Sequence, residues 1–336
     1  MQPLSEIYAQ LTGSGKRIGI IMHQKPDADA MGSSLALSIF LRGLGHETLV
    51  VSPTNWAGFL NWMPNCREVL DFEKQTAKTE NWLNNCDLIF CLDFNHFGRT
   101  KKMQPYLTSM PVTKVLIDHH QEPQTEAFAY GKSDTSKSST SEMIYDFIMD
   151  SDHDSLLNAE MAQCLYAGVM TDTGSFRFPS TKPSVHRMVA HLMELGLDHS
   201  IIHDELFDNY LENRLRFLGH VLCNRMDIFY EYNTSLIAVP FSDLKRYDIR
   251  TGDTEGIVNL QQSISGLKLA AIIIDRGDEV KLSFRSKGNV DVNTFARKYF
   301  EGGGHFHAAG GSSKTGLEDT VRRFKKALEE NIDILQ

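Results

Sequence analysis

The chain has 336 residues, of which 41% are hydrophobic, and this length favours two domains, each with its own core. Its formal charge is −9, from 34 Lys and Arg against 43 Asp and Glu, which argues against a protein that coats long duplex nucleic acid. It has no apolar run of 18 residues, no signal-peptide pattern and no C-x-x-C pair among its five cysteines, so we expect a cytoplasmic protein with no membrane partner, disulfide framework or zinc ribbon.

The first half of the chain alternates between strand-like and helix-like segments. Five short runs are rich in Ile, Val, Leu or Phe: 17–22, 47–51, 87–92, 114–117 and 127–130. At least the first four are predicted to be strands. The clearest helix lies at 30–44, where Leu35, Ile39 and Leu44 recur near helical spacing and Gly45 can end it. This alternation predicts an α/β domain with a parallel sheet and helices on both faces.

A mainly helical region follows. Ser139 and Glu142 have the spacing of a capping box before a helix at 143–149. Further helices are predicted at 159–170, 183–195 and 199–222, and the last carries enough charge to be partly exposed. We therefore expect a first domain at 1–195 and a helical linker at 196–224.

From residue 225 the pattern is rich in strands again, ending in a helix at 292–300 and the glycine cluster GGGHFHAAGG. It predicts a smaller α/β domain at 225–336, with a cleft between the two domains. Residues 268–326 hold twelve Lys and Arg against seven Asp and Glu, which leaves a net −14 for the rest of the chain. A small phosphorylated ligand is compatible with this distribution.

Asp and His residues follow several predicted elements of the first domain. They are His23, Asp27 and Asp29 after the first strand, Asp93 after LIFCL, Asp118, His119 and His120 after KVLI, and Asp172 at the end of a helix. A single Asp after a strand is usually a turn former or a helix cap. Because functional groups gather at the carboxyl ends of parallel strands, however, the combination predicts one site.

So many carboxylates at one sheet edge would be costly without cations. Two divalent metals about 3.5–4 Å apart would offset the charge, and such pairs catalyse phosphoester hydrolysis. Mixed Asp and His ligands favour Mn²⁺, leave Fe²⁺, Co²⁺ and Zn²⁺ open, and suit Mg²⁺ less well.

The order H-x-x-P-D-x-D, a lone Asp, D-H-H and a downstream Asp resembles the DHH phosphoesterase superfamily. The second half resembles the DHHA1 substrate-binding domain, through GGGH-x-x-AAG at 302–310 and a strand that ends in Phe284, Arg285 and Ser286. The compact length and the segment TEGIVN at 254–259 are most similar to the stand-alone nanoRNase and pAp phosphatase branch.

The resemblance implies a role for each residue of the motif. His23 and Asp27 would hold one metal, Asp29, His119 and Asp172 the other, and Asp93 would bridge them. Asp118 would orient a neighbouring His, and His120 would contact the phosphate or the leaving group.

A phosphate clamp is expected in the second domain. Gly303 and Gly304 would let backbone N–H groups approach an anion, while His305 and Arg285 would supply donors, with Ser286 beside them. A glycine-rich segment alone is more often a tight turn, and His307 has no assigned role.

The resulting hypothesis is a two-metal phosphoesterase that cleaves RNA or DNA oligonucleotides of about two to five nucleotides, pAp, or both. The alternatives are a single-strand exonuclease of the RecJ type, a cyclic-dinucleotide phosphodiesterase, a pyrophosphatase, and a nucleotide-binding regulator without hydrolysis. The sequence leaves the oligomeric state open, with a homodimer among the options.

Overall fold

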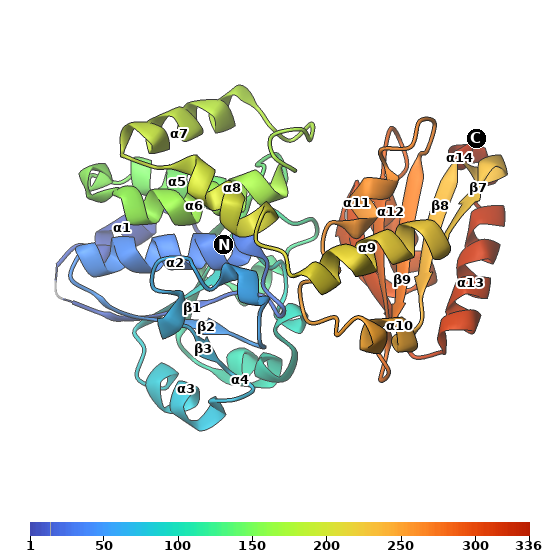
Figure 1. Ribbon diagram of the computed structural model, residues 1–336. Helices are drawn as coiled ribbons and strands as arrows, with labels where there is room; N and C mark the ends of the chain where they lie inside the picture. Colours follow the sequence, from blue (N-terminus) through green and yellow to red (C-terminus); the bar gives the residue numbers. More distant parts are fainter. Residues whose placement is uncertain (14) are drawn as a thin grey trace. The chain divides into compact units, whose positions relative to one another are not determined.

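The computed structural model describes residues 1–13 and 15–336. They form two compact units, Met1–Asn209 and Tyr210–Gln336 (Figure 1). The division falls inside the predicted helical segment 196–224, which contributes one helix to each unit. Across the described ranges, no helix combines the length and apolar character needed to cross a membrane.

The first unit is built on a six-stranded sheet in which all paired strands are parallel. Its order is β3-β2-β1-β4-β5-β6, with strands β1 (Arg17–Ile21), β2 (Glu47–Ser52), β3 (Leu70–Asp71), β4 (Leu88–Leu92), β5 (Thr113–Asp118) and β6 (Tyr130–Ser133). The predicted parallel α/β architecture is confirmed. The strand predicted at 127–130 is displaced, because Thr125–Ala127 forms a 3-10 turn and β6 begins only at Tyr130.

Helices cover both faces of this sheet (Figure 1). They are α1 (Ser5–Leu11), α2 (Ala28–Gly43), α3 (Thr76–Leu83), α4 (Gln104–Ser109), α5 (Thr140–Met149), α6 (Ala159–Asp172), α7 (Pro183–Glu194) and α8 (His199–Phe207). The side chains of β4 alternate: Leu88 and Phe90 enter the core shared with α2, α5 and α6, and Ile89 and Cys91 enter the core shared with α3 and α4. Burial on both faces explains why the strands are uninterrupted apolar runs.

Short polar side chains begin the helices that position the site. Asp27 caps α2, with Oδ1 accepting hydrogen bonds from the N–H groups of Asp29 and Ala30 at 3.0 Å each. Ser139 caps α5 by accepting from the N–H of Glu142 at 2.9 Å, as the sequence predicted. Helices α2 and α6 approach so closely that a Cβ on Gly32 would lie 2.3 Å from the carbonyl oxygen of Cys164.

The second unit has a six-stranded mixed sheet in the order β11-β12-β10-β9-β8-β7. Its strands are β7 (Met226–Phe229), β8 (Thr234–Val239), β9 (Leu269–Asp275), β10 (Val280–Ser286), β11 (Glu301–His305) and β12 (Ala308–Ser313). Its helices are α9 (Glu212–Asn224), α10 (Phe241–Arg246), α11 (Ile257–Gln261), α12 (Val292–Tyr299), α13 (Leu317–Glu329) and α14 (Ile332–Leu335). Helices α12 and α13 share a core with one face of the sheet, and α9, α10 and α11 with the other.

The glycine cluster forms two paired strands. Strands β11 and β12 pair antiparallel, and only residues 306 and 307 lie between them. A Cβ on Gly302 would lie 2.2 Å from the carbonyl oxygen of Gly310, and Gly304 has a φ of +153°. The glycines therefore allow the two strands to approach each other closely. Loops also require glycines, so the sequence alone does not show which of the two structures forms.

Candidate metal centre

The predicted metal-binding residues meet at the carboxyl edge of the first sheet. His23 follows β1, Asp93 follows β4 directly, and Asp118 ends β5; these three strands are adjacent in the sheet. Asp172 is the last residue of α6. The structure thus brings together side chains separated by up to about 150 positions along the chain.

Asp93 lies between two imidazoles. Its Oδ2 is 3.3 Å from Nε2 of His23, and its Oδ1 is 3.4 Å from Nε2 of His119. Oδ2 of Asp27 lies 3.8 Å from Nε2 of His23. On the other side, Nε2 of His119 is 3.3 Å from Oδ2 of Asp172 and 3.7 Å from Oδ2 of Asp29.

These contacts suit cations better than direct hydrogen bonds, which are typically 2.7–3.2 Å for an N–H donor. Atoms bound to one cation at about 2.1 Å lie roughly 3 to 3.5 Å apart when they are adjacent ligands. Among the groups whose members each offer a ligand atom within 4.8 Å of the others are His23, Asp27 and Asp93, and Asp29, Asp93 and His119. The buried donor set therefore fits metal binding of the type the sequence predicted.

The N-terminus of α5 supports two of the carboxylates. Both oxygens of Asp29, which is fully buried, accept N–H groups at the start of α5, from Thr140 at 2.7 Å and from Ser141 at 2.8 Å. The hydroxyl of Thr140 donates to Oδ1 of Asp93 at 2.9 Å. Asp93 has a φ of +62°, which is unfavourable for a residue with a side chain. Strain of this kind is characteristic of functional positions.

The carboxylates strongly affect both imidazoles. Burial opposes a charge on His23, but the carboxylates of Asp27 and Asp93 outweigh it and raise its pKa to about 9. His119 shows the same competition, in which Asp172 and Asp93 overcome burial and raise its pKa well above the usual value. Without cations, the protein favours protons at the positions that the metals would occupy.

The pKa values of the carboxylates shift in different directions. Burial, together with the charges of Asp93 and Asp172, raises the pKa of Asp29 well above its usual value. Burial likewise raises the pKa of Asp172 to about 6. For Asp93, burial is outweighed by His119 and His23, and its pKa falls well below the usual value. The pKa of Asp27 is also lowered, because its contacts with His23 outweigh burial. Asp93 and Asp27 are therefore the carboxylates of this cluster that favour the ionised form, which is the form that binds a cation.

A second set of contacts adjoins Asp93. Nδ1 of His120 is 2.7 Å from Oδ1 of Asp118, and Nε2 of His120 is 2.9 Å from Nη1 of Arg99. A guanidinium can only donate, so Nε2 must accept and the ring proton resides on Nδ1, where it is donated to Asp118. Burial, with the nearby charge of Asp93, raises the pKa of Asp118 to about 7.

Two residues of this site, Arg99 and Thr140, were not predicted from the sequence. Arg99 also donates to the carbonyl oxygen of Asp93 at 3.2 Å, and Thr140 supports the Asp93 carboxylate as described above. Arg99 lies in the 3-10 helix Phe97–Met103, outside any predicted strand or helix, and a lone Arg has no characteristic spacing, so nothing in the sequence marked it. Thr140 directly follows the predicted cap Ser139, and its place at a helix N-terminus was the available signal.

The predicted phosphate-binding residues belong to the second unit. Arg285 on β10 and His305 on β11 both lie opposite Ala308 of β12, so the three form one row across the sheet. Directly opposed side chains point to the same face, and the structure thus brings Arg285 and His305 to one face, roughly 10 Å apart across two strand spacings.

The neighbouring predicted residues make contacts within the unit. The hydroxyl of Ser286 donates to the carbonyl oxygen of Val290 at 2.6 Å, and the N–H of Gly304 donates to Oδ1 of Asn293 at 2.9 Å. Gly303 lies beside Asn293 in β11, where a Cβ would be 3.4 Å from Oδ1 of Asn293.

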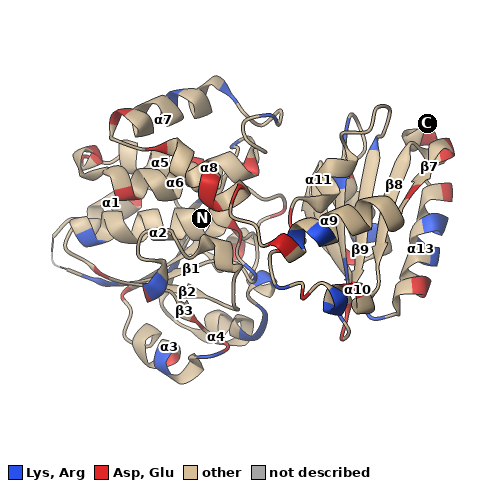
Figure 2. Cartoon of the chain, viewed as in Figure 1, with Lys and Arg blue, Asp and Glu red and all other residues tan. Residues whose placement is uncertain are grey.

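The positive charge of residues 268–326 is dispersed over the second unit. Four of its basic residues, Arg322, Arg323, Lys325 and Lys326, lie on α13, interspersed with acidic residues (Figure 2). Arg285 lies on strand β10 and not on α13. The charge excess therefore marks no single binding groove.

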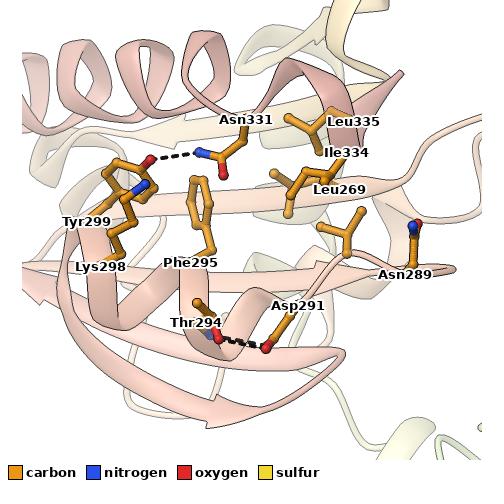
Figure 3. Close-up of a pocket in the computed structure, with 11 residues that line it drawn as sticks. Leu269, Asn289, Asp291, Thr294, Phe295, Lys298, Tyr299, Asn331, Ile334 and Leu335 are labelled. Atoms are coloured by element: carbon orange, nitrogen blue, oxygen red, sulfur yellow. Dashed lines mark hydrogen bonds between the residues drawn. The ribbon is translucent and has the colours of Figure 1, made fainter.

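The second unit also contains a cavity of about 160 Å³ (Figure 3). Phe295 forms part of its apolar wall, and Lys298 and Asn331 contribute polar groups. None of the predicted substrate-binding residues lines it, so it is separate from the row formed by Arg285 and His305.

Comparisons with known proteins agree with this organisation. The model of the DHH family, N-terminal domain, matches residues 17–169, and the DHHA1 domain model matches residues 233–333. The crystal structure of an exopolyphosphatase-related protein from Bacteroides fragilis superposes with a TM-score of 0.92 and 32% identity, covering 98% of this chain and 96% of that one.

Curated relatives are similar over nearly the same length. The bifunctional oligoribonuclease and PAP phosphatase NrnA of Bacillus subtilis is 29% identical over 299 residues, covering 87% of this chain and 88% of the relative. The Thermus thermophilus protein of the same name is 28% identical over 340 residues, covering 99% and 94%. The chain therefore belongs to the DHH/DHHA1 superfamily, as a phosphoesterase similar to NrnA.

Proposed function

We propose that this protein hydrolyses short oligonucleotides of about two to five nucleotides, including linear dinucleotides, to mononucleotides, or pAp to AMP, or both. The observation that carries the proposal is the position of Asp93, whose two oxygens each lie 3.3–3.4 Å from the Nε2 atom of a different buried histidine. A carboxylate so placed can serve two cations at once. The names of the NrnA relatives, which refer to an oligoribonuclease and a PAP phosphatase, support the substrate class.

Two divalent cations, with Mn²⁺ favoured, fit this donor set. His23 and Asp27 would hold one, Asp29, His119 and Asp172 the other, and Asp93 both. Bound there, the cations would supply Lewis-acid stabilisation of the phosphoryl oxygens and activation of water. The protein contributes the support: the α5 N–H groups orient Asp29, and Thr140 orients Asp93.

The second unit would bind the substrate through the row that contains Arg285 and His305. A guanidinium can contact two phosphate oxygens, and one such clamp suits a short substrate better than a long strand. Affinity for long strands grows with the number of neutralised phosphates, and the chain has a net charge of −9.

A product time course tests this proposal. The substrates are 5′-labelled oligonucleotides of two to about ten nucleotides, a twenty-nucleotide strand and pAp, with chelated and Mn²⁺-reloaded protein. We expect metal-dependent turnover that is most efficient on the shortest substrates or on pAp. Greater efficiency on the twenty-nucleotide strand would favour the RecJ-type exonuclease, and binding without turnover would favour the regulator.

A further inference from the structure

We propose that Arg99 binds the substrate phosphate at the metal centre, and that Asp118 and His120 are positioning residues that orient its guanidinium. This inference rests on the proposed function and deepens it, because it names the cation with which the protein itself recognises the phosphate. The family resemblance implied that contact for His120, and the geometry points to Arg99 instead.

The first reason is the direction of the hydrogen bonds. Nη1 of Arg99 donates to Nε2 of His120 at 2.9 Å, and Nδ1 of His120 lies 2.7 Å from Asp118. In this arrangement both ring nitrogens of His120 are engaged, and Nε2 carries no proton that it could donate to a phosphate oxygen. The donors next to Nε2 belong to Arg99.

The second reason is the set of partners of Arg99. The residue is half-buried, and its side chain donates to two uncharged acceptors, Nε2 of His120 and the carbonyl oxygen of Asp93. The nearby carboxylates of Asp93 and Asp118 form their ion pairs with histidines rather than with Arg99. Both of these bonds use Nη1, so the other N–H groups of the fork remain for a planar anion such as phosphate.

The third reason is the placement of the Arg99 backbone. Its carbonyl oxygen accepts from the N–H of Gln24 at 2.8 Å, and its own N–H donates to the carbonyl oxygen of His96 at 3.1 Å. Gln24 directly follows the candidate ligand His23, and the Arg99 side chain contacts Asp93. Arg99 is therefore fixed between two strand ends of the metal centre before any substrate arrives, which reduces the entropic cost of binding.

The ligand class follows from this chemistry. A permanently charged, planar fork beside two cations recognises the non-bridging oxygens of a phosphate ester and stabilises the charge that develops on them during hydrolysis. Arg99 transfers no proton, because its guanidinium remains protonated. Asp118 and His120 act only through it, by fixing the direction of Nη1.

Variants of Arg99 test the contact. We compare wild type, Arg99→Lys and Arg99→Gln in the full chain reloaded with Mn²⁺, with Lys102→Gln as the control. Lys102 lies three residues away in the same 3-10 helix, Phe97–Met103, with a side chain 78% exposed, so its substitution removes the same charge from the same element. The readouts are metal content, calorimetric affinity for inorganic phosphate, and kcat/KM on a dinucleotide.

We expect Arg99→Gln to weaken phosphate binding and to lower kcat/KM by about 10- to 100-fold, with metal content unchanged. Arg99→Lys keeps the charge without the fork and should lie in between, and it remains informative if the Gln variant is unstable. Unchanged phosphate affinity in the Arg99 variants, or loss of metal from them, would overturn the assignment. A wild type that binds phosphate through Arg99 without cleaving nucleotides would refute only the proposed function.

A double-mutant cycle tests the positioning pair. If His120 acts through Arg99, His120→Ala and Arg99→Gln together should lower kcat/KM no more than the larger single effect. Independent contacts to phosphate would instead multiply the two losses, and that result would overturn the positioning role. His120→Ala alone should lower kcat strongly while the metal content stays nearly intact.

Discussion

The two units assemble their candidate residues in opposite ways. In the first unit, the ligands come from separate strand ends and one helix end, and Asp29 and Asp93 are almost completely buried. In the second unit, Arg285 and His305 lie on two strands of one continuous segment, and both remain partly exposed. The difference teaches that the function of a buried cluster of charges depends on all its members, because removing one leaves the others unpaired. Removing one partly exposed side chain from a row should lower the affinity only in part.

The largest effect is expected for Asp93→Asn. An amide cannot provide two anionic oxygens, so both cations lose a ligand, and we expect turnover to fall by more than about 10³-fold with lower metal occupancy. Elemental analysis and the dinucleotide assay check this, with circular dichroism to verify folding. Full activity of the variant at saturating metal would contradict the bridging role.

The next effect concerns pH and the coupled Asp and His groups of the first unit. His23 has its pKa raised to about 9, and a metal binds only the neutral ring, so each cation must displace a proton below that pH. Metal affinity should therefore rise, by up to about tenfold per pH unit, between pH 7 and 9 and then level off. Calorimetry in buffers of different ionisation enthalpy should detect the released protons; a pH-independent affinity would contradict the prediction.

The raised pKa of His23 should affect the stability of the metal-free protein in the opposite direction, so that this stability falls as the pH rises. A raised His pKa stabilises the fold fully below the unfolded value of 6.5, and this stabilisation is lost as the pH rises through about 9. The metal-free protein should thus have a higher Tm near pH 6 than near pH 9 as far as this group is concerned. The variant His23→Gln should reduce that difference in thermal unfolding scans.

A graded effect is expected in the second unit. Arg285→Ala should raise KM for dinucleotides by about tenfold and leave the metal content unchanged, because a charge-assisted contact is lost far from the ligands in the sequence. His305→Ala should act in the same direction. Measuring kcat/KM on two-, five- and twenty-nucleotide substrates at fixed salt shows whether these residues set the preference for short substrates; equal losses on all three lengths would argue against it.

The smallest effects concern packing, where the two units should behave alike. Ala at Gly32 or Gly302 would place Cβ 2.3 Å or 2.2 Å from a backbone carbonyl oxygen, and we expect a loss of about 1–3 kcal/mol in the free energy of unfolding. A Cβ on Gly219 in α9 would meet no described atom within 4 Å outside its own helix, so Gly219→Ala should gain up to about 1 kcal/mol. Denaturant unfolding of the three variants measures the two expected losses and the expected gain in the free energy of unfolding.

Much of the first unit was predictable because its determinants are local. Strands β1, β2, β4 and β5 are short runs rich in Ile, Val, Leu and Phe, and the chain reaches Asp or His residues of the site at or just after the ends of β1, β4 and β5. A parallel sheet brings the carboxyl ends of adjacent strands to one edge. The sequence could therefore predict that His23, Asp93 and His119 meet, without any knowledge of their distances.

Other features depend on contacts between distant segments. The β11–β12 hairpin requires glycines because two backbones approach each other, and the sequence alone does not separate this need from that of an anion-binding loop. Strand β3 has two residues and β6 has four, which is too few for a periodic hydrophobic pattern.

The sequence by itself determined the fold class and the residues available for metal binding, because hydrophobic periodicity and strand-end chemistry are written in consecutive positions. Only the tertiary structure decided which side chains support them. Arg99 reaches His120 and the backbone of Asp93, and Thr140 reaches the Asp93 carboxylate across 47 positions. Such hydrogen bonds depend on the direction of a side chain and on its distance from an acceptor, and both are set when the strand ends and the N-terminus of α5 pack together.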